Sequence, residues 1–377
     1  MDLIKTRQYL HQFPEVSDQE VKTSKFIVKK LKEIGVSKVQ KIAKTTGILA
    51  EINAQKPGKT LLFRAELDAL PIQEQNPELS YASKTKGVSH KCGHDGHMTI
   101  LLGLAQKLLQ EKDFSGKILL LFQPSEENGK GAKAVMESKI LENYEIDYVF
   151  ALHNIPKYPL KKVICKPGNF TPSVESLEVK LIGKTSHAGM PENGINPAKT
   201  IAELIRFYQS LHQPNHQKKD YFLSTPVYLQ MGEKAYGISA GEGEISYTFR
   251  AYDDDFFQTQ KVKIEKQTKE IIEKTTGLSS QLIWKEAFSA NKNHLKAYEF
   301  IRQAAKENKL EFIEKEEGFS WGEDFGLFTQ HFSGAMFGIG AGIDQPELHN
   351  PDYDFPDELL TPGIQMFYRL IKIIENE

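Results

Sequence analysis

The sequence has little cysteine, no long apolar run and almost no excess of either charge. Its 377 residues include only two cysteines, Cys92 and Cys165, which excludes a disulfide framework. No stretch of about 18 apolar residues is present, and the opening MDLIKTRQYLHQF has no apolar signal-peptide core. The 48 basic and 50 acidic residues give no reason to expect nucleic acid or an anionic membrane as a partner. We expect a cytoplasmic protein with reduced thiols.

The first third of the chain alternates short apolar runs with helical patterns. Ranges 60–67, 117–124 and 147–152 have the length of buried strands, and range 97–110 is apolar at helical spacing. This β-α-β order predicts an α/β fold with a mixed, mostly parallel sheet beneath helices. Before it, Ser17 and Asp18 are expected to cap a helix that ends at Gly35.

The pattern of expected strands and helices changes near Thr171, and the earlier pattern returns near Asn291. The strands expected between these points are 176–183, 224–232, 244–253 and 279–288, and the helices are 196–211 and 256–274. A chain of this length also predicts two domains. We expect residues 1–171 and 291–377 to form the larger domain. Residues 172–290 are expected to form an inserted, smaller α+β domain of ferredoxin-like type.

Metal-binding residue types follow the expected strands at the points where these strands end. In open α/β sheets, sites form beyond the carboxyl ends of the strands. Cysteine and histidine suit Zn²⁺, and added carboxylates also admit Mn²⁺, Co²⁺ or Ni²⁺. A thiolate can bridge two such ions. The residues that converge on this edge are Asp68, Cys92, His94, Glu126, Glu127, His153 and His349.

The adjacent pair Glu126 and Glu127 gives the clearest chemical signal. Consecutive side chains at a strand end point in different directions, so one carboxylate can bind metal while the other reaches a water molecule. Each residue also has an ordinary structural interpretation. Cys92 can be a small buried side chain, His153 a core histidine and His349 the start of a turn. Adjacent glutamates are commonly a solvated surface, and Asp68 could cap a helix.

The chain resembles the amidohydrolases of the metallopeptidase M20 group. The similarity is greatest to the branch with hippurate hydrolases, N-acetyldiaminopimelate deacetylases and indoleacetyl-amino acid hydrolases. The motifs that carry the resemblance occur in the family's order and spacing from end to end. They are RQYLHQFPE (7–15), RAELDALPI (64–72), HKCGHDGHMT (90–99), LLFQPSEENGKGAKAVMES (120–138), ALHNIP (151–156), SHAGMPENGINPA (186–198), GEDFG (322–326) and LHNPDYDFPDE (348–358).

This resemblance implies a hydrolase of amide bonds that uses two divalent metal ions per subunit. The residues that match the family's ligands are Cys92, His94, Glu127, His153 and His349. Glu126 matches the general base and acid, and Asp68 and Asp95 match residues that orient ligands. His187, in the smaller domain, matches a histidine that donates to the developing oxyanion. The resemblance also implies that this domain is a lid or dimerisation domain, so a homodimer through it is expected.

The sequence departs from the family in its substrate-facing motifs. Glu66 stands where relatives usually have aspartate, Glu192 replaces a histidine and Asn196 replaces an aspartate. Gly237 occupies the position of an asparagine that holds substrate in relatives. Arg250 matches a family arginine that can grip a substrate carboxylate, although it could equally be an ordinary strand-end charge. We therefore expect hydrolysis to be retained and the substrate pocket to differ.

The sequence favours a metal-dependent hydrolase of N-acyl amino acids or related small amides. One alternative is a protein on the same fold that binds metal or a small molecule without catalysis, which the altered motif around Glu192 suggests. A dipeptidase is another. A cysteine hydrolase that uses Cys92 is a third, but the nearby acids and imidazoles exceed what a thiol nucleophile requires.

Overall fold

Two compact units make up the chain in the computed structural model, which describes all 377 residues. The first unit comprises residues 1–170, 291–316 and 324–377, and the second comprises residues 171–290 and 317–323. The segment 317–323, which the sequence placed in the larger domain, thus belongs to the second unit. None of the helices combines the length and the apolar character that a membrane span requires.

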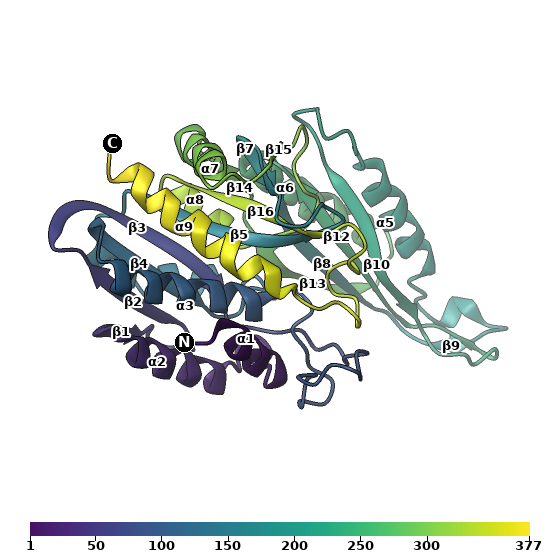
Figure 1. The fold of residues 1–377 in the computed structure, drawn as a ribbon. Helices are drawn as coiled ribbons and strands as arrows, with labels where there is room; N and C mark the ends of the chain where they lie inside the picture. The colour runs from purple at the N-terminus through teal and green to yellow at the C-terminus, as the bar shows by residue number, and fades with distance from the viewer. The chain divides into compact units, whose positions relative to one another are not determined.

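An eight-stranded sheet forms the centre of the first unit (Figure 1), with strand order β1-β2-β4-β3-β5-β16-β6-β15. The pairs β4–β3, β3–β5, β5–β16 and β6–β15 are parallel, and β1–β2, β2–β4 and β16–β6 are antiparallel. The predicted mixed, mostly parallel sheet is therefore confirmed. The strands are β1 (Lys38–Lys41), β2 (Ile48–Asn53), β3 (Lys56–Glu66), β4 (Ser115–Gln123), β5 (Tyr148–Pro156), β6 (Val163–Cys165), β15 (Phe312–Glu314) and β16 (Gly334–Gly342).

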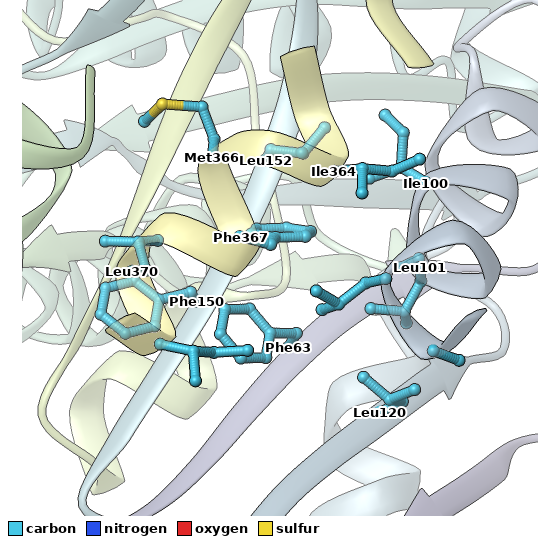
Figure 2. Packing of buried hydrophobic residues seen from close by; sticks show 14 of the residues in the cluster. Phe63, Ile100, Leu101, Leu120, Phe150, Leu152, Ile364, Met366, Phe367 and Leu370 are labelled. Carbon is cyan, nitrogen blue, oxygen red and sulfur yellow. The ribbon is translucent and has the colours of Figure 1, made fainter. Parts of the chain in front are cut away.

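Both faces of this sheet are buried. Along β4, Leu120 joins the core cluster shown in Figure 2, whereas Leu119 and Leu121 point to the opposite face, and all three are fully buried. A strand covered on both faces requires a continuous apolar sequence, which explains the run KILLLF. Helices α3 and α9 pack together over one face, where the rings of Phe63 and Phe367 lie 4.9 Å apart. The helices of this unit are α1 (Leu3–Gln12), α2 (Val21–Ile34), α3 (His94–Glu111), α4 (Gly131–Glu137), α7 (Leu295–Glu307), α8 (Gly326–His331) and α9 (Leu360–Ile374).

Helix α2 ends as predicted but begins differently. Gly35 closes it in the left-handed conformation with a φ of 102°. At its start, Ser17 and Asp18 do not act as caps. The Glu15 carboxylate instead accepts hydrogen bonds from two backbone N–H groups of the first turn, and the Ser17 hydroxyl donates to Asp68. Ser17 thus binds the loop that follows β3.

The second unit is a four-stranded antiparallel sheet of order β10-β12-β8-β13, with helices α5 and α6 against one face. Its element order, β8-α5-β10-β12-α6-β13, is the predicted ferredoxin-like arrangement. Alternate side chains such as Tyr247 and Phe249 join the core on the helical side. The elements are β8 (Ser173–Ile182), α5 (Ala198–Ser210), β10 (Leu223–Met231), β12 (Glu242–Ala251), α6 (Asp254–Glu273) and β13 (Ser279–Phe288), with the short strands β9 (Ser186–His187) and β11 (Ile238–Ser239).

The segment 317–323 is held to β12 of the second unit by its backbone carbonyls. Arg250 Nε donates to Ser320 O at 2.9 Å, and the Tyr252 hydroxyl donates to Phe319 O at 3.2 Å. The Phe319 and Trp321 rings lie 5.0 Å apart within the segment. These contacts explain why a stretch that is distant in sequence belongs to this unit.

Candidate metal centre

A cluster of metal-binding side chains lies in the first unit where strands β3, β4 and β5 end and helix α3 begins. Three overlapping groups each have their ligand atoms within 4.8 Å of one another. Cys92 belongs to two of these groups. The groups are Cys92, His94 and His153; Cys92, Glu127 and His349; and His94, Glu126 and Glu127.

The backbone before helix α3 places Cys92 beside strand β5. Gly93 has a φ of 96°, and a Cβ atom at this position would lie 2.4 Å from Asn154 Oδ1. Only glycine therefore allows this turn so close to β5. The turn brings Cys92 Sγ to 3.4 Å from His153 Nε2. The sequence predicted that this strand ends at residue 152. In the structure β5 continues to Pro156, and His153 pairs with Gly338 of β16.

Backbone carbonyls fix the orientation of two imidazoles. His94 Nδ1 lies 2.8 Å from Asp68 O, and His153 Nδ1 lies 2.9 Å from Asn154 O. Because a carbonyl oxygen only accepts, Nδ1 carries the proton and Nε2 is directed into the cluster. His94 Nε2 is buried and makes no hydrogen bond within the protein. It lies 3.8 Å from Glu127 Oε1 and 4.0 Å from Glu126 Oε2.

The charge around His94 also suits a cation. Burial opposes protonation of this imidazole, but the negative charges of Glu66, Asp68 and Glu127 outweigh it and raise the pKa of His94 to about 10. A divalent cation would compete with that proton for the same lone pair. The unpartnered Nε2, the negative surroundings and the donor set of thiol, imidazole and carboxylate therefore fit bound divalent metal ions.

A strained turn after β4 directs the two adjacent glutamates. Ser125 has a φ of 52°, in the left-handed region, and its N–H donates to Glu20 Oε1 at 2.7 Å. Two residues later, the N–H of Glu127 donates to Asp68 Oδ2 at 2.9 Å. The turn leaves Glu126 buried, with only 6% of its surface exposed, beside the ligand groups.

His349 reaches the cluster from the loop that follows β16. Its backbone has a φ of 67°, and its N–H donates to Lys91 O at 2.8 Å, next to Cys92. Its Nε2 lies 3.6 Å from Glu127 Oε2, and 52% of its side chain is exposed. His349 thus forms the solvent-facing side of the cluster.

Asp95, His187 and Arg250 belong to none of these ligand groups. Asp95 was expected to orient a ligand, but its carboxylate binds His11 Nδ1 at 2.9 Å and Arg7 Nη1 at 3.3 Å. His187 is exposed on β9 of the second unit, and Arg250 lies on β12 of that unit. Gly237, one of the sequence departures, accepts a hydrogen bond from the residue after His187.

The sequence interpretation missed several buried polar residues beside the cluster. His97 lies between Glu66 and Asn154, and Asn154 binds the Tyr353 hydroxyl. A signal existed for His97, which follows His94 by one helical turn. Glu66 was named only as a departure from the family, although it precedes Asp68 by two residues near the end of a strand. Asn154 and Tyr353 gave no such signal.

Thiol, imidazole and carboxylate groups meet at the carboxyl ends of these strands, a donor set that suits divalent metal ions. The model of "Peptidase family M20/M25/M40" matches residues 62–373 of the chain. The chain belongs to this family.

Individual relatives cover nearly the whole chain. It is 33% identical to the N-acetyl-L-cysteine deacetylase of Bacillus subtilis, over 98% of this chain and 87% of the relative. It is 32% identical to the hippurate hydrolase of Campylobacter jejuni, over 97% and 94%. The crystal structure of the Bacillus subtilis YXEP protein, a dinuclear metal-binding peptidase from the M20 family, superposes with a TM-score of 0.82 at 28% identity, over 99% of this chain and 98% of that chain.

Proposed function

We propose that this protein removes the acyl group from N-acyl amino acids. The observation that carries the proposal is the buried Glu126 carboxylate, 4.0 Å from His94 Nε2 and outside the set of proposed ligands. Purely structural metal binding has no need of such a carboxylate, whereas amide hydrolysis requires a group that moves a proton. The names of the two relatives above specify acyl amino acids, N-acetyl-L-cysteine and hippurate (N-benzoylglycine).

We assign two divalent ions, Zn²⁺, Mn²⁺, Co²⁺ or Ni²⁺, to five side chains of the cluster. When bound, such ions polarise an amide carbonyl and lower the pKa of a water molecule. The proposed ligands are Cys92, His94, Glu127, His153 and His349. We also propose that the protein is cytoplasmic, where a thiol ligand stays reduced, and cell fractionation tests this location.

The chain's own residues would carry the proton and hold the substrate. Glu126 takes a proton from the attacking water and passes it to the leaving amine. Asp68 orients His94 through its carbonyl and Glu127 through its carboxylate. His187 donates a hydrogen bond to the oxyanion, and Arg250 binds the substrate carboxylate. One Arg250 donor already holds Ser320 O, so four N–H donors remain for substrate.

We also propose that the protein forms a homodimer through strand β10. This strand lies at the edge of its sheet, and Val227, Leu229 and Met231 are 56%, 56% and 42% exposed. An unpaired edge with exposed apolar side chains is suited to pairing with a second copy. Sedimentation should show a dimer that Leu229→Glu separates into monomers. A monomeric wild-type protein would contradict the proposal.

The direct test is amine release from a substrate panel of N-acetyl, N-benzoyl and indoleacetyl amino acids and dipeptides. Each reaction is run with Zn²⁺, Mn²⁺, Co²⁺ or Ni²⁺ and again with a chelator. We expect metal-dependent release from a subset of the acyl amino acids and none with the chelator. Substrates with an amidated carboxyl group should have a higher KM, because they cannot form the charged pair with Arg250.

Other outcomes of the panel would redirect the assignment. Cleavage of dipeptides alone would identify a dipeptidase. Metal-loaded protein that binds panel compounds but releases no amine would identify a binding protein without catalysis. Activity that survives the chelator but is lost on thiol alkylation would identify Cys92 as a nucleophile.

A further inference from the structure

A chain of buried polar side chains runs beneath the cluster. Arg64 donates through Nε to Gln123 Oε1 at 2.9 Å and pairs with Glu66. Glu66 Oε2 lies 2.7 Å from His97 Nδ1, and His97 Nε2 lies 2.5 Å from Asn154 Oδ1. The chain ends where Asn154 Nδ2 donates to the Tyr353 hydroxyl at 2.6 Å. All six side chains are buried: Arg64, Glu66, His97, Gln123, Asn154 and Tyr353.

This polar chain has a member in every segment that carries a proposed ligand. His97 lies one helical turn after His94, and Asn154 directly follows His153. Tyr353 follows His349 by four residues. On the other side, Gln123 ends the strand that leads to the glutamate pair, and Glu66 ends the strand that leads to Asp68. The network therefore links backbone segments that the sequence keeps far apart.

His97 lies at the centre of the chain and touches two proposed ligands. Its ring lies edge-to-face against His153, with ring centroids 4.8 Å apart, and the His94 ring is 5.6 Å away. The hydrogen bonds to Glu66 and Asn154 hold the ring from both nitrogens. Because the His97 ring is held in this way and lies against both His94 and His153, it can set the distance between these two imidazoles.

His97 is not itself a plausible ligand in this arrangement. Glu66, His94 and His97 do have ligand atoms within 4.8 Å of one another. However, both nitrogens of His97 already face oxygen atoms, and Glu66 pairs with Arg64 and His97. Arg64, Glu66 and His97 are all buried, and burial strengthens the hydrogen bonds among them. Glu66 and His97 are therefore expected to keep these partners and not to bind a metal ion.

We infer that His97 is a positioning residue that sets the spacing of His94 and His153 at the metal centre. It acts through its hydrogen bonds to Glu66 and Asn154. This inference rests on the ligands assigned under the proposed function. Glu66 makes its contact with His97 through Oε2, which lies 2.7 Å from His97 Nδ1.

The test is titration of metal-free protein with Co²⁺, followed by calorimetry and visible absorption. Sulfur-to-cobalt absorption and the d–d bands report the ligand geometry directly. In His97→Gln, which removes the ring and leaves no polar atom at the Nδ1 position that meets Glu66, we expect Co²⁺ to bind about 10- to 100-fold more weakly with a shifted spectrum. His97→Asn, which retains a polar group near the Nδ1 position, should restore part of the affinity. An unchanged affinity and spectrum in His97→Gln would overturn the inference.

The matched control is Leu101→Ala, one turn further along helix α3. Leu101 is fully buried in the apolar core and belongs to no part of the polar chain. This variant should be less stable but keep the wild-type Co²⁺ spectrum. If His97→Gln does not fold, Asn154→Ser removes the amide that contacts His97 Nε2, and an unchanged Co²⁺ affinity and spectrum there would likewise overturn the inference. Wild-type protein that binds two Co²⁺ but cleaves no amide would contradict the proposed function alone.

Discussion

A Glu126→Gln variant is expected to keep its metal ions and to lose about 10²- to 10⁴-fold in kcat. Glutamine has nearly the shape of glutamate but cannot take a proton from water at neutral pH. Because Glu126 lies outside the proposed ligand set, its replacement should leave metal content and KM nearly unchanged. Steady-state kinetics on the best panel substrate, with metal analysis of the same sample, measures both quantities.

The companion variant for this experiment is His187→Ala, which addresses a different step. Loss of a donor to the oxyanion should lower kcat by about 10²- to 10³-fold, again with full metal content.

Two outcomes would contradict the role of Glu126. Wild-type turnover in Glu126→Gln would show that Glu126 does not take part in the reaction. A loss of metal in that variant would instead make it a ligand. These results separate proton transfer from metal binding.

An Arg7→Met variant is expected to lose about 3–5 kcal/mol of the free energy of unfolding of the first unit. The Arg7 side chain is fully buried, and its guanidinium binds Asp95 at 3.3 Å, Asp354 at 2.8 Å and Asp357 at 2.7 Å. Methionine fills similar volume but leaves these carboxylates without their cation. The largest cost is expected at Asp95, because its carboxylate is fully buried and would lose a cationic partner.

Urea unfolding followed by far-ultraviolet circular dichroism measures this loss. The two tryptophans, Trp284 and Trp321, both lie in the second unit, so their fluorescence reports that unit separately. Lys5→Met on the same helix is the control, since the Lys5 side chain is 83% exposed and should contribute little. Equal midpoints in Arg7→Met and Lys5→Met would show that the buried ion pairs do not stabilise the unit.

The sequence was most informative where a segment's environment is set by its own residues. Continuous apolar runs predicted β3 and β4, and strict alternation predicted β12, because burial on two faces or one face dictates those patterns. Strand β1 was missed, since KVQK is short and largely exposed, and its pairing with β2 defines it. Strand β5 was predicted too short because its final residues are held by pairing with β16.

The same distinction applies to the site. Cys92, His94 and the glutamate pair could be proposed because their residue types and positions at strand ends imply chemistry. The bond from Asn154 to Tyr353 joins residues 199 positions apart, and no local pattern encodes it. The contacts of Asp95 could not be predicted for a related reason. Its partner Arg7 comes from the first helix, and the sequence between them gives no sign of that contact.

The segment 317–323 has a consequence for exchanging modules between relatives. A module inserted once into a host chain is joined to it by two peptide connections, but the second unit here is joined by four. A chimaera that swaps residues 171–290 alone would separate Arg250 and Tyr252 from the carbonyls they bind. Seven further residues must travel with the module. The natural unit of recombination is therefore discontinuous, and it cannot be moved by a single cut and splice.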